Sequence, residues 1–165
     1  VLAKQAGCGR TPWHFDDHHF PLDTNDVVTA WAPAQPIPIE MGPLTFAYPI
    51  DIHKLVNTVT FEKTGTGYDR GVSDVFLKNN VSINETPFEM GEVSFHHNLN
   101  FHSAPRNRTN RSRVALANTY YRDGARVVNA PTMVSGDWQK FMPNVKPGDV
   151  AASPLNPICW PVKDK

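Results

Sequence analysis

Proline and glycine limit the kinds of fold that this chain can adopt. Fifteen prolines and ten glycines are distributed along its 165 residues. Proline removes a helix hydrogen bond and glycine weakens a helix, so few windows can hold a long helix. Between them lie short runs rich in β-forming residues, at 27–31, 44–48, 58–61, 72–77, 92–101 and 113–121. This pattern is typical of an all-β sandwich or barrel.

The last part of the chain, from Pro131 onward, has the composition of irregular structure. It contains the segments SGDWQKFMPNVKPGD and SPLNPICWP. We expect a short helical turn at 138–141. We also expect Trp138, Phe141 and Trp160 to pack over the outside of the sheet.

Length and charge indicate one domain without a polyanionic partner. A chain of 165 residues can bury one core, so we expect residues 1–165 to form a single domain. The first motif lies at residue 14, and we therefore expect the N-terminal elements of a longer protein to be missing. Basic and acidic residues number 16 each, which argues against a nucleic-acid partner. No run of 18 apolar residues predicts a membrane span.

The two cysteines, Cys8 and Cys159, lie near opposite ends of the chain. Two isolated cysteines in a neutral protein are more often free thiols in a reducing compartment than a disulfide. We therefore expect free thiols and a cytoplasmic location.

A His-x-Asp pair, His14 and Asp16, is the first candidate for chemistry. On an extended segment, residues i and i+2 project from the same face, so both side chains can approach one metal ion. A second histidine would complete the 2-His-1-carboxylate triad, which suits Fe(II) and leaves positions open. By itself, His-x-Asp also occurs in exposed loops.

A zinc site is the alternative for this segment, with His14 and His18 four residues apart on a helix. Pro12 and Pro21 flank the segment and argue against a helix there. His18 is then a candidate for contact with a substrate.

If the segment 92–101 is a strand, its side chains point alternately to the two faces of the sheet. Period-2 alternation then places four polar side chains on one face, those of His96, Asn98, Asn100 and His102. A polar face inside a barrel is costly unless it binds something polar. His102 lies at the end of this strand beside a loop, which makes it a candidate ligand. The alternative is a solvent-facing polar stripe on an edge strand.

Arg113 shares a strand face with Ala115 and Ala117. A guanidinium binds a carboxylate through two parallel hydrogen bonds, and the alanines leave room for a small ligand. This arrangement would suit a dicarboxylate such as 2-oxoglutarate, although a lone arginine often forms a surface ion pair. The nearby basic loop could contact phosphate, but it has no interleaved aromatic residues, and we do not expect nucleic-acid binding.

Three stretches together resemble the phytanoyl-CoA dioxygenase (PhyH) family of non-haem iron oxygenases. They are WHFDDHHFPLDTNDVVTAWAPAQPIPIEMGPLTF, FHHNLNFHSAPRN and RSRVALANTYY. Arg113 follows His102 by eleven residues, and Asp16 precedes His102 by 86 residues, as expected for the family. The resemblance covers roughly residues 10 to 122.

The resemblance implies a double-stranded β-helix, a cupin-like jelly-roll barrel with iron at its open end. It implies that His14, Asp16 and His102 bind Fe(II). It also implies that Arg113 holds the distal carboxylate of 2-oxoglutarate and that Trp31 contacts this cosubstrate.

The reaction implied is a dioxygenase reaction. O₂ and 2-oxoglutarate are consumed, succinate and CO₂ are released, and an unidentified small-molecule or acyl substrate is oxidised. Related halogenases lack the carboxylate that Asp16 supplies, so its presence favours hydroxylation. Candidate substrate contacts are His18, Asn98 and Asn100. A different metalloenzyme on the same barrel, a non-catalytic cupin-like binding domain and a metal-free remnant of the family are the alternatives.

Overall fold

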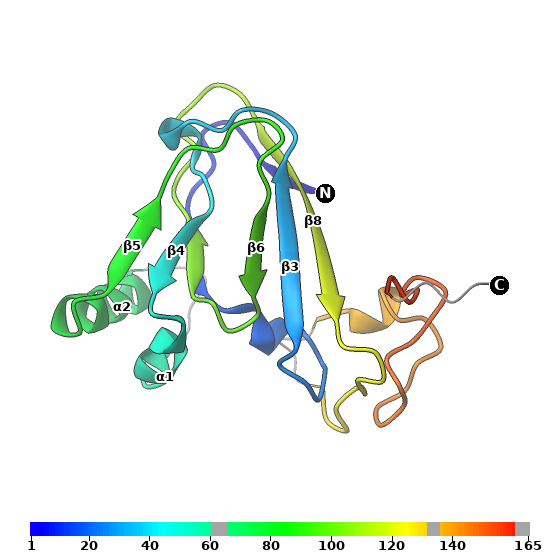
Figure 1. Cartoon of the computed structure of the whole chain (residues 1–165). Coiled ribbons are helices and arrows are strands. Elements are labelled where there is room, and N and C mark those ends of the chain that lie inside the picture. The colour runs from blue at the N-terminus through cyan, green and yellow to red at the C-terminus, as the bar shows by residue number, and fades with distance from the viewer. Residues whose placement is uncertain (61–65, 132–135, 161–165) are drawn as a thin grey trace.

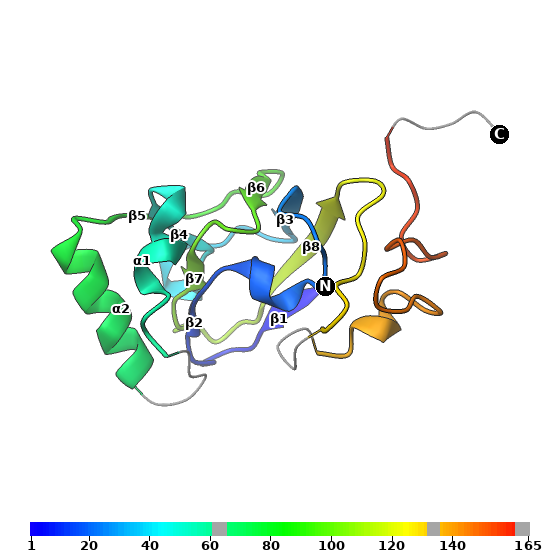
Figure 2. The same ribbon diagram turned by 90° about the horizontal axis from the view of Figure 1, so that it is seen from below.

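Two antiparallel four-stranded sheets face each other in the computed structural model of the protein, which describes residues 1–60, 66–131 and 136–160. Figure 2 shows the two layers from below, with the strands of one sheet on each side. In order across the first sheet, the strands are β1 (Leu2–Lys4), β8 (Arg113–Tyr121), β3 (Val27–Pro33) and β6 (Ser94–His97). The second sheet contains β2 (Thr11–His14), β7 (His102–Ala104), β4 (Thr45–Tyr48) and β5 (Ser82–Glu85). The all-β jelly-roll prediction is confirmed.

Strand β3 illustrates why these residues form the sheet. Val27, Thr29 and Trp31 are buried, whereas the residues between them are only half-buried. This alternation is the period of a strand with one face against a core. The predicted strands at 27–31, 44–48 and 113–121 correspond to β3, β4 and β8.

The predicted strand at 72–77 is wrong, because these residues belong to helix α2 (Gly67–Lys78). Tyr68, Val72 and Phe76 are buried and lie four residues apart, which is the spacing of one helix face. They pack in a cluster with Ile52 of η3 (Ile50–Ile52) and Val56 of α1 (His53–Val56). Both α-helices lie beside β4 and β5 in Figure 1. The predicted strand at 58–61 is also absent over 58–60, and residue 61 lies outside the described residues.

The single strand predicted at 92–101 is divided in two. A turn at 98–100 separates β6 from β7, which belong to opposite sheets. The amide of Asn98 donates to the carbonyl of Val27 at 3.1 Å, and that of Asn100 donates to the carbonyl of His97 at 2.9 Å. These bonds hold the chain in the crossing between the sheets.

The C-terminal part forms a small cluster at one end of the sheets. The predicted helical turn is present as η5 (Trp138–Lys140), and Trp138 is buried with Leu22, Val27 and Val127. The prediction that Phe141 and Trp160 pack over the outside of the sheet is wrong. These side chains are 69% and 84% exposed, because no described element covers them.

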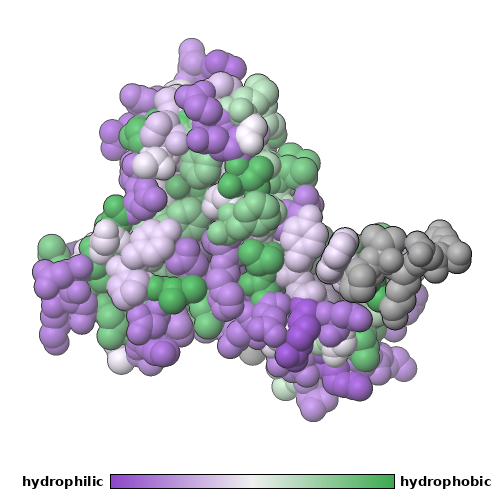
Figure 3. Space-filling view, in the orientation of Figure 1, coloured by the Kyte–Doolittle hydropathy of each residue, from purple (hydrophilic) through white to green (hydrophobic). Residues whose placement is uncertain are grey.

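Exposed hydrophobic side chains also occur on the sheets. Figure 3 shows hydrophobic side chains near β6 and β3, and Phe95 of β6 is 70% exposed. No helix in the described ranges combines the length and the apolar character needed to cross a bilayer.

Candidate metal centre

The His-x-Asp pair lies where strand β2 ends. His14 is the last residue of β2, and Asp16 begins the short helix η1 (Asp16–His19). The amide of Asp16 donates to the carbonyl of Asn98 at 2.8 Å, which fixes the start of η1 against the turn between β6 and β7. The pair is therefore positioned by a strand end and a turn.

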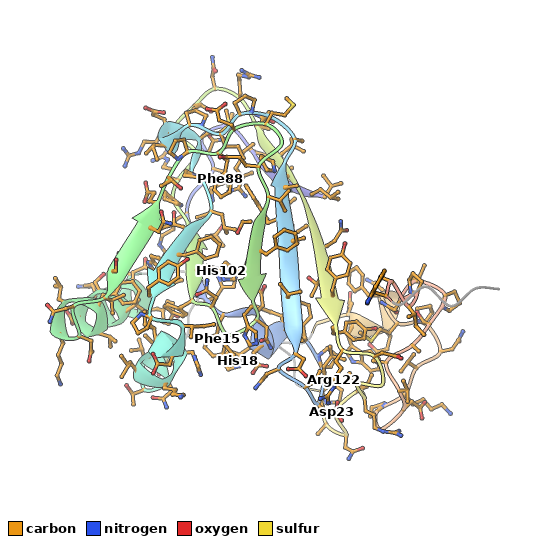
Figure 4. The ribbon with its side chains drawn as sticks, viewed as in Figure 1. Phe15, His18, Asp23, Phe88, His102 and Arg122 are labelled. Atoms are coloured by element: carbon orange, nitrogen blue, oxygen red, sulfur yellow. The ribbon has the colours of Figure 1, made fainter. Side chains whose placement is uncertain are left out.

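The structure brings the three predicted metal ligands together. His14 pairs with His102 across β2 and β7. The Nε2 atoms of His14 and His102 lie 3.8 Å and 3.7 Å from the same oxygen of Asp16, Oδ1. One potential ligand atom from each residue lies within 4.8 Å of the others. Figure 4 shows His102 between the two sheets, above Phe15 and His18.

Backbone carbonyls fix the tautomer of both histidines. The Nδ1 of His14 donates to the carbonyl of Pro12 at 2.8 Å, and the Nδ1 of His102 donates to that of Asn100 at 2.9 Å. A carbonyl can only accept, so the proton is on Nδ1 and the lone pair is on Nε2. Both imidazoles thus present an Nε2 lone pair toward Asp16, in the form that binds a metal.

The pKa values of the three groups favour the same state. Burial lowers the pKa of His102 to about 3 and also lowers the pKa of His14. Burial by itself raises the pKa of Asp16, but the interaction with His96 and the other two imidazoles outweigh it and lower the value to about 2. At neutral pH the site therefore holds neutral imidazoles and a carboxylate, as metal binding requires.

A third imidazole, that of His96, also faces this carboxylate. Its Nε2 lies 3.8 Å from the other oxygen of Asp16, Oδ2, and the residue is 5% exposed. Alternation in the sequence placed His96 on the polar face but gave it no role. The contact arises because β6 and β2 belong to the two facing sheets, and Asp16 follows β2.

A cavity of about 500 Å³ adjoins the three residues and extends to Arg113. Arg113 is 6% exposed, donates from Nη1 to the carbonyl of Gly42 at 2.7 Å, and lies 5.4 Å from the ring centre of Trp31. Both residues predicted to contact a cosubstrate therefore line one cavity with the candidate metal ligands.

Lys4 is a second buried cation in this cavity that the sequence did not identify. It pairs with Arg113 across β1 and β8, is 7% exposed, and donates from Nζ to Oγ1 of Thr11 at 3.3 Å. Burial and then the charge of Arg113 lower the pKa of Lys4, and burial lowers that of Arg113. No acidic residue in the described parts of the chain forms an ion pair with either cation. The signal that could have identified Lys4 is strand pairing, which the sequence does not give.

The predicted substrate contacts lie elsewhere. His18 is exposed and lines a second cavity of about 280 Å³, which touches His14 but neither Asp16 nor His102. Asn98 and Asn100 are buried in the turn between β6 and β7 and line neither cavity.

Comparisons with known proteins identify the family and the fold of the chain. The family model of phytanoyl-CoA dioxygenase (PhyH) matches residues 1–115. The non-haem α-ketoglutarate-dependent carbocyclase SnoK from nogalamycin biosynthesis has the same fold, with a TM-score of 0.70 and 24% identity over 93% of this chain and 57% of that chain. The epimerase SnoN from nogalamycin biosynthesis gives a TM-score of 0.66 and 21% identity over 93% of this chain and 58% of that chain.

A structure of SnoN in complex with Fe³⁺, α-ketoglutarate and nogalamycin RO also matches, with a TM-score of 0.57 and 22% identity over 76% of this chain and 49% of that chain. No curated protein gives a significant sequence match. The chain spans about half the length of these solved structures. The match of the family model to more than two thirds of the sequence means that the chain belongs to the phytanoyl-CoA dioxygenase (PhyH) family.

Proposed function

We propose that this chain forms the catalytic core of an Fe(II)- and 2-oxoglutarate-dependent oxygenase, with iron held by His14, Asp16 and His102. One observation carries the proposal. The Nε2 atoms of His14 and His102, whose tautomers are fixed by backbone carbonyls, lie 3.8 Å and 3.7 Å from one carboxylate oxygen of Asp16. A donor set of two imidazoles and one carboxylate fits Fe(II) and leaves positions open for a cosubstrate and O₂. When bound, the iron supplies the redox chemistry that couples decarboxylation of 2-oxoglutarate to oxidation of a substrate C–H bond.

Arg113 and Lys4 are proposed to hold the distal carboxylate of 2-oxoglutarate. A guanidinium has five N–H donors, and Gly42 accepts one hydrogen bond, from Nη1. These two buried cations form no ion pair with an acidic residue in the described parts of the chain, and they would attract a dianion strongly because burial weakens their solvation. Trp31 lies against Arg113 and would limit the position of its guanidinium.

The organic substrate is proposed to occupy the end of the same cavity that lies away from the two cations. Thr29 and Thr119 line this end, and their hydroxyl groups share a hydrogen bond of 3.0 Å. Phe20 adds an apolar wall. These side chains have no permanent charge, which favours an uncharged part of the substrate near the metal ligands.

Hydroxylation is the proposed outcome, with a small-molecule or acyl substrate. SnoK and SnoN are named as a carbocyclase and an epimerase, so members of this fold that use α-ketoglutarate catalyse several outcomes. Asp16 provides the carboxylate ligand that related halogenases lack, and it therefore favours transfer of oxygen.

Anaerobic titration with Fe(II) and 2-oxoglutarate, followed by optical spectroscopy, tests the proposal. The expected result is a weak visible charge-transfer band in the wild type that is lost or weakened in Arg113→Ala. Arg111→Ala is the matched control, because Arg111 is exposed two residues away. A well-folded wild-type protein without the band would favour a binding domain that has the fold but no catalysis.

A further inference from the structure

Three imidazoles surround the carboxylate of Asp16, and they differ in their second nitrogen. In His14 and His102, Nδ1 donates to a backbone carbonyl. In His96, Nδ1 is buried and has no hydrogen-bond partner in the described structure. The tautomer that leaves the Nε2 lone pair free is therefore fixed in two of the three histidines only.

The other ring nitrogen of His96, Nε2, faces Asp16. Its Nε2 lies 3.8 Å from Oδ2, and a carboxylate oxygen accepts hydrogen bonds but cannot donate them. A neutral imidazole facing a carboxylate is favoured with its proton on the nearer nitrogen. His96 therefore presents an Nε2–H to Asp16, the opposite of what the two candidate ligands present.

The two carboxylate oxygens are thus assigned to different partners. The Nε2 atoms of His14 and His102, which carry lone pairs, face Oδ1, whereas the Nε2 of His96 faces Oδ2. A carboxylate whose second oxygen faces such a donor would bind a metal through its other oxygen. The second oxygen is then kept away from the positions that the cosubstrate and O₂ need.

Packing holds His96 in this position, since its contact with Asp16 at 3.8 Å is longer than a hydrogen bond. It lies on β6 directly opposite Thr29 of β3, and its ring centre is 5.3 Å from that of Phe46 and 4.9 Å from that of His102. A polar ring that is 5% exposed is costly to bury unless a partner uses it. A leucine of similar size would cost less for folding alone, which indicates a role in the site.

We propose that His96 is a positioning residue that holds Oδ2 of Asp16 and keeps this carboxylate monodentate toward the metal. This inference rests on the proposed function, because it assigns His96 to the same metal centre. Removal of a polar group that contacts a metal ligand commonly changes metal affinity about 10- to 100-fold, and an effect of about this size is expected for His96.

Calorimetric titration with Mn²⁺ in the presence of 2-oxoglutarate tests the role of His96. His96→Leu removes the donor, and His96→Gln retains an N–H at a similar reach. We expect His96→Leu to weaken Mn²⁺ binding about 10- to 100-fold and His96→Gln to remain within a few-fold of the wild type. His97→Leu is the matched control, because His97 is the neighbouring histidine on the opposite face of β6.

Urea unfolding of the metal-free variants separates positioning from a purely structural role. We expect His96→Leu to unfold at the same or a higher urea concentration than the wild type. Wild-type Mn²⁺ affinity in His96→Leu, or equal losses in the Gln and Leu variants, would overturn the inference. It would also fail if weaker Mn²⁺ binding came only with weaker folding. A wild type that does not bind Mn²⁺ would instead refute the metal centre and this inference with it.

Discussion

Replacement of Lys4 by methionine tests the cationic end of the cavity. Lys4 is 7% exposed and lies opposite Arg113. Methionine keeps a long apolar side chain at this buried position but removes the positive charge. A hydrogen bond to a charged group contributes about 1.5–3 kcal/mol. Loss of one such contact should therefore weaken 2-oxoglutarate binding about 10- to 150-fold.

The effect should be confined to the distal carboxylate. 2-Oxopentanoate has the same chain length as 2-oxoglutarate but lacks that carboxylate, so Lys4→Met should leave its affinity nearly unchanged. Calorimetry of both ligands with the Mn²⁺-loaded protein measures the two affinities. Lys54→Met is the control, because Lys54 is an exposed lysine on α1.

Folding should respond in the opposite direction. Burial and then the charge of Arg113 lower the pKa of Lys4, so its charged form is unfavourable in the folded protein. Removing that charge should hold or raise the free energy of unfolding at neutral pH. Equal weakening of both ligands, or a loss of stability that accounts for the weaker binding, would refute the reasoning.

Three further predictions concern the turn beside Arg113, the pH dependence of folding and the metal ligands. Gly42→Ala should lower the free energy of unfolding by about 3 kcal/mol, because Gly42 has a φ of 72° and its Cβ would lie 2.3 Å from the carbonyl oxygen of Pro105. Gly124→Ala, with a φ of 79° and open space around the new Cβ, should cost only about 1–2 kcal/mol in the same urea titration. The pKa of His102 is about 3 in the folded protein and 6.5 in the unfolded chain. The unfolded chain therefore binds a proton first as pH falls, and stability should drop by about 1.4 kcal/mol per pH unit between roughly pH 6 and pH 4. A His102→Leu variant with an unchanged slope would contradict this. Asp16→Ala should weaken Mn²⁺ binding at least about 100-fold by calorimetry, and an unchanged affinity would exclude Asp16 as a ligand.

The parts of the fold that the sequence predicted are those with a local signal. Strand β3 alternates between buried and half-buried residues, and β8 begins at Arg113 and ends at Tyr121 as expected. The strand prediction for 72–77 was wrong because it rested on the β-forming residues of this run and not on their spacing. The four-residue spacing of Tyr68, Val72 and Phe76 was the better guide.

The candidate site divides in the same way. His14, Asp16, His102 and Arg113 could be named as candidates because their combined spacing along the chain resembles that of the family. Lys4 was missed because it pairs with Arg113, a residue 109 positions further along the chain, and no local pattern reveals such a pairing. The contact of His96 with Asp16 was missed for a similar reason, since His96 lies on β6 of one sheet and Asp16 follows β2 of the other.

Strand register explains how the three residues of the candidate metal centre come together. In β2 and β7, Thr11 pairs with Ala104, so an unbroken ladder would place His14 opposite Phe101. A register shift between Thr11 and His14 instead places His14 opposite His102. An extra residue in one strand re-aims the side chains that follow it, because a shift of one position exchanges the two faces. The irregularity in β2 is therefore what turns His14 toward the partner that completes the pair of imidazoles.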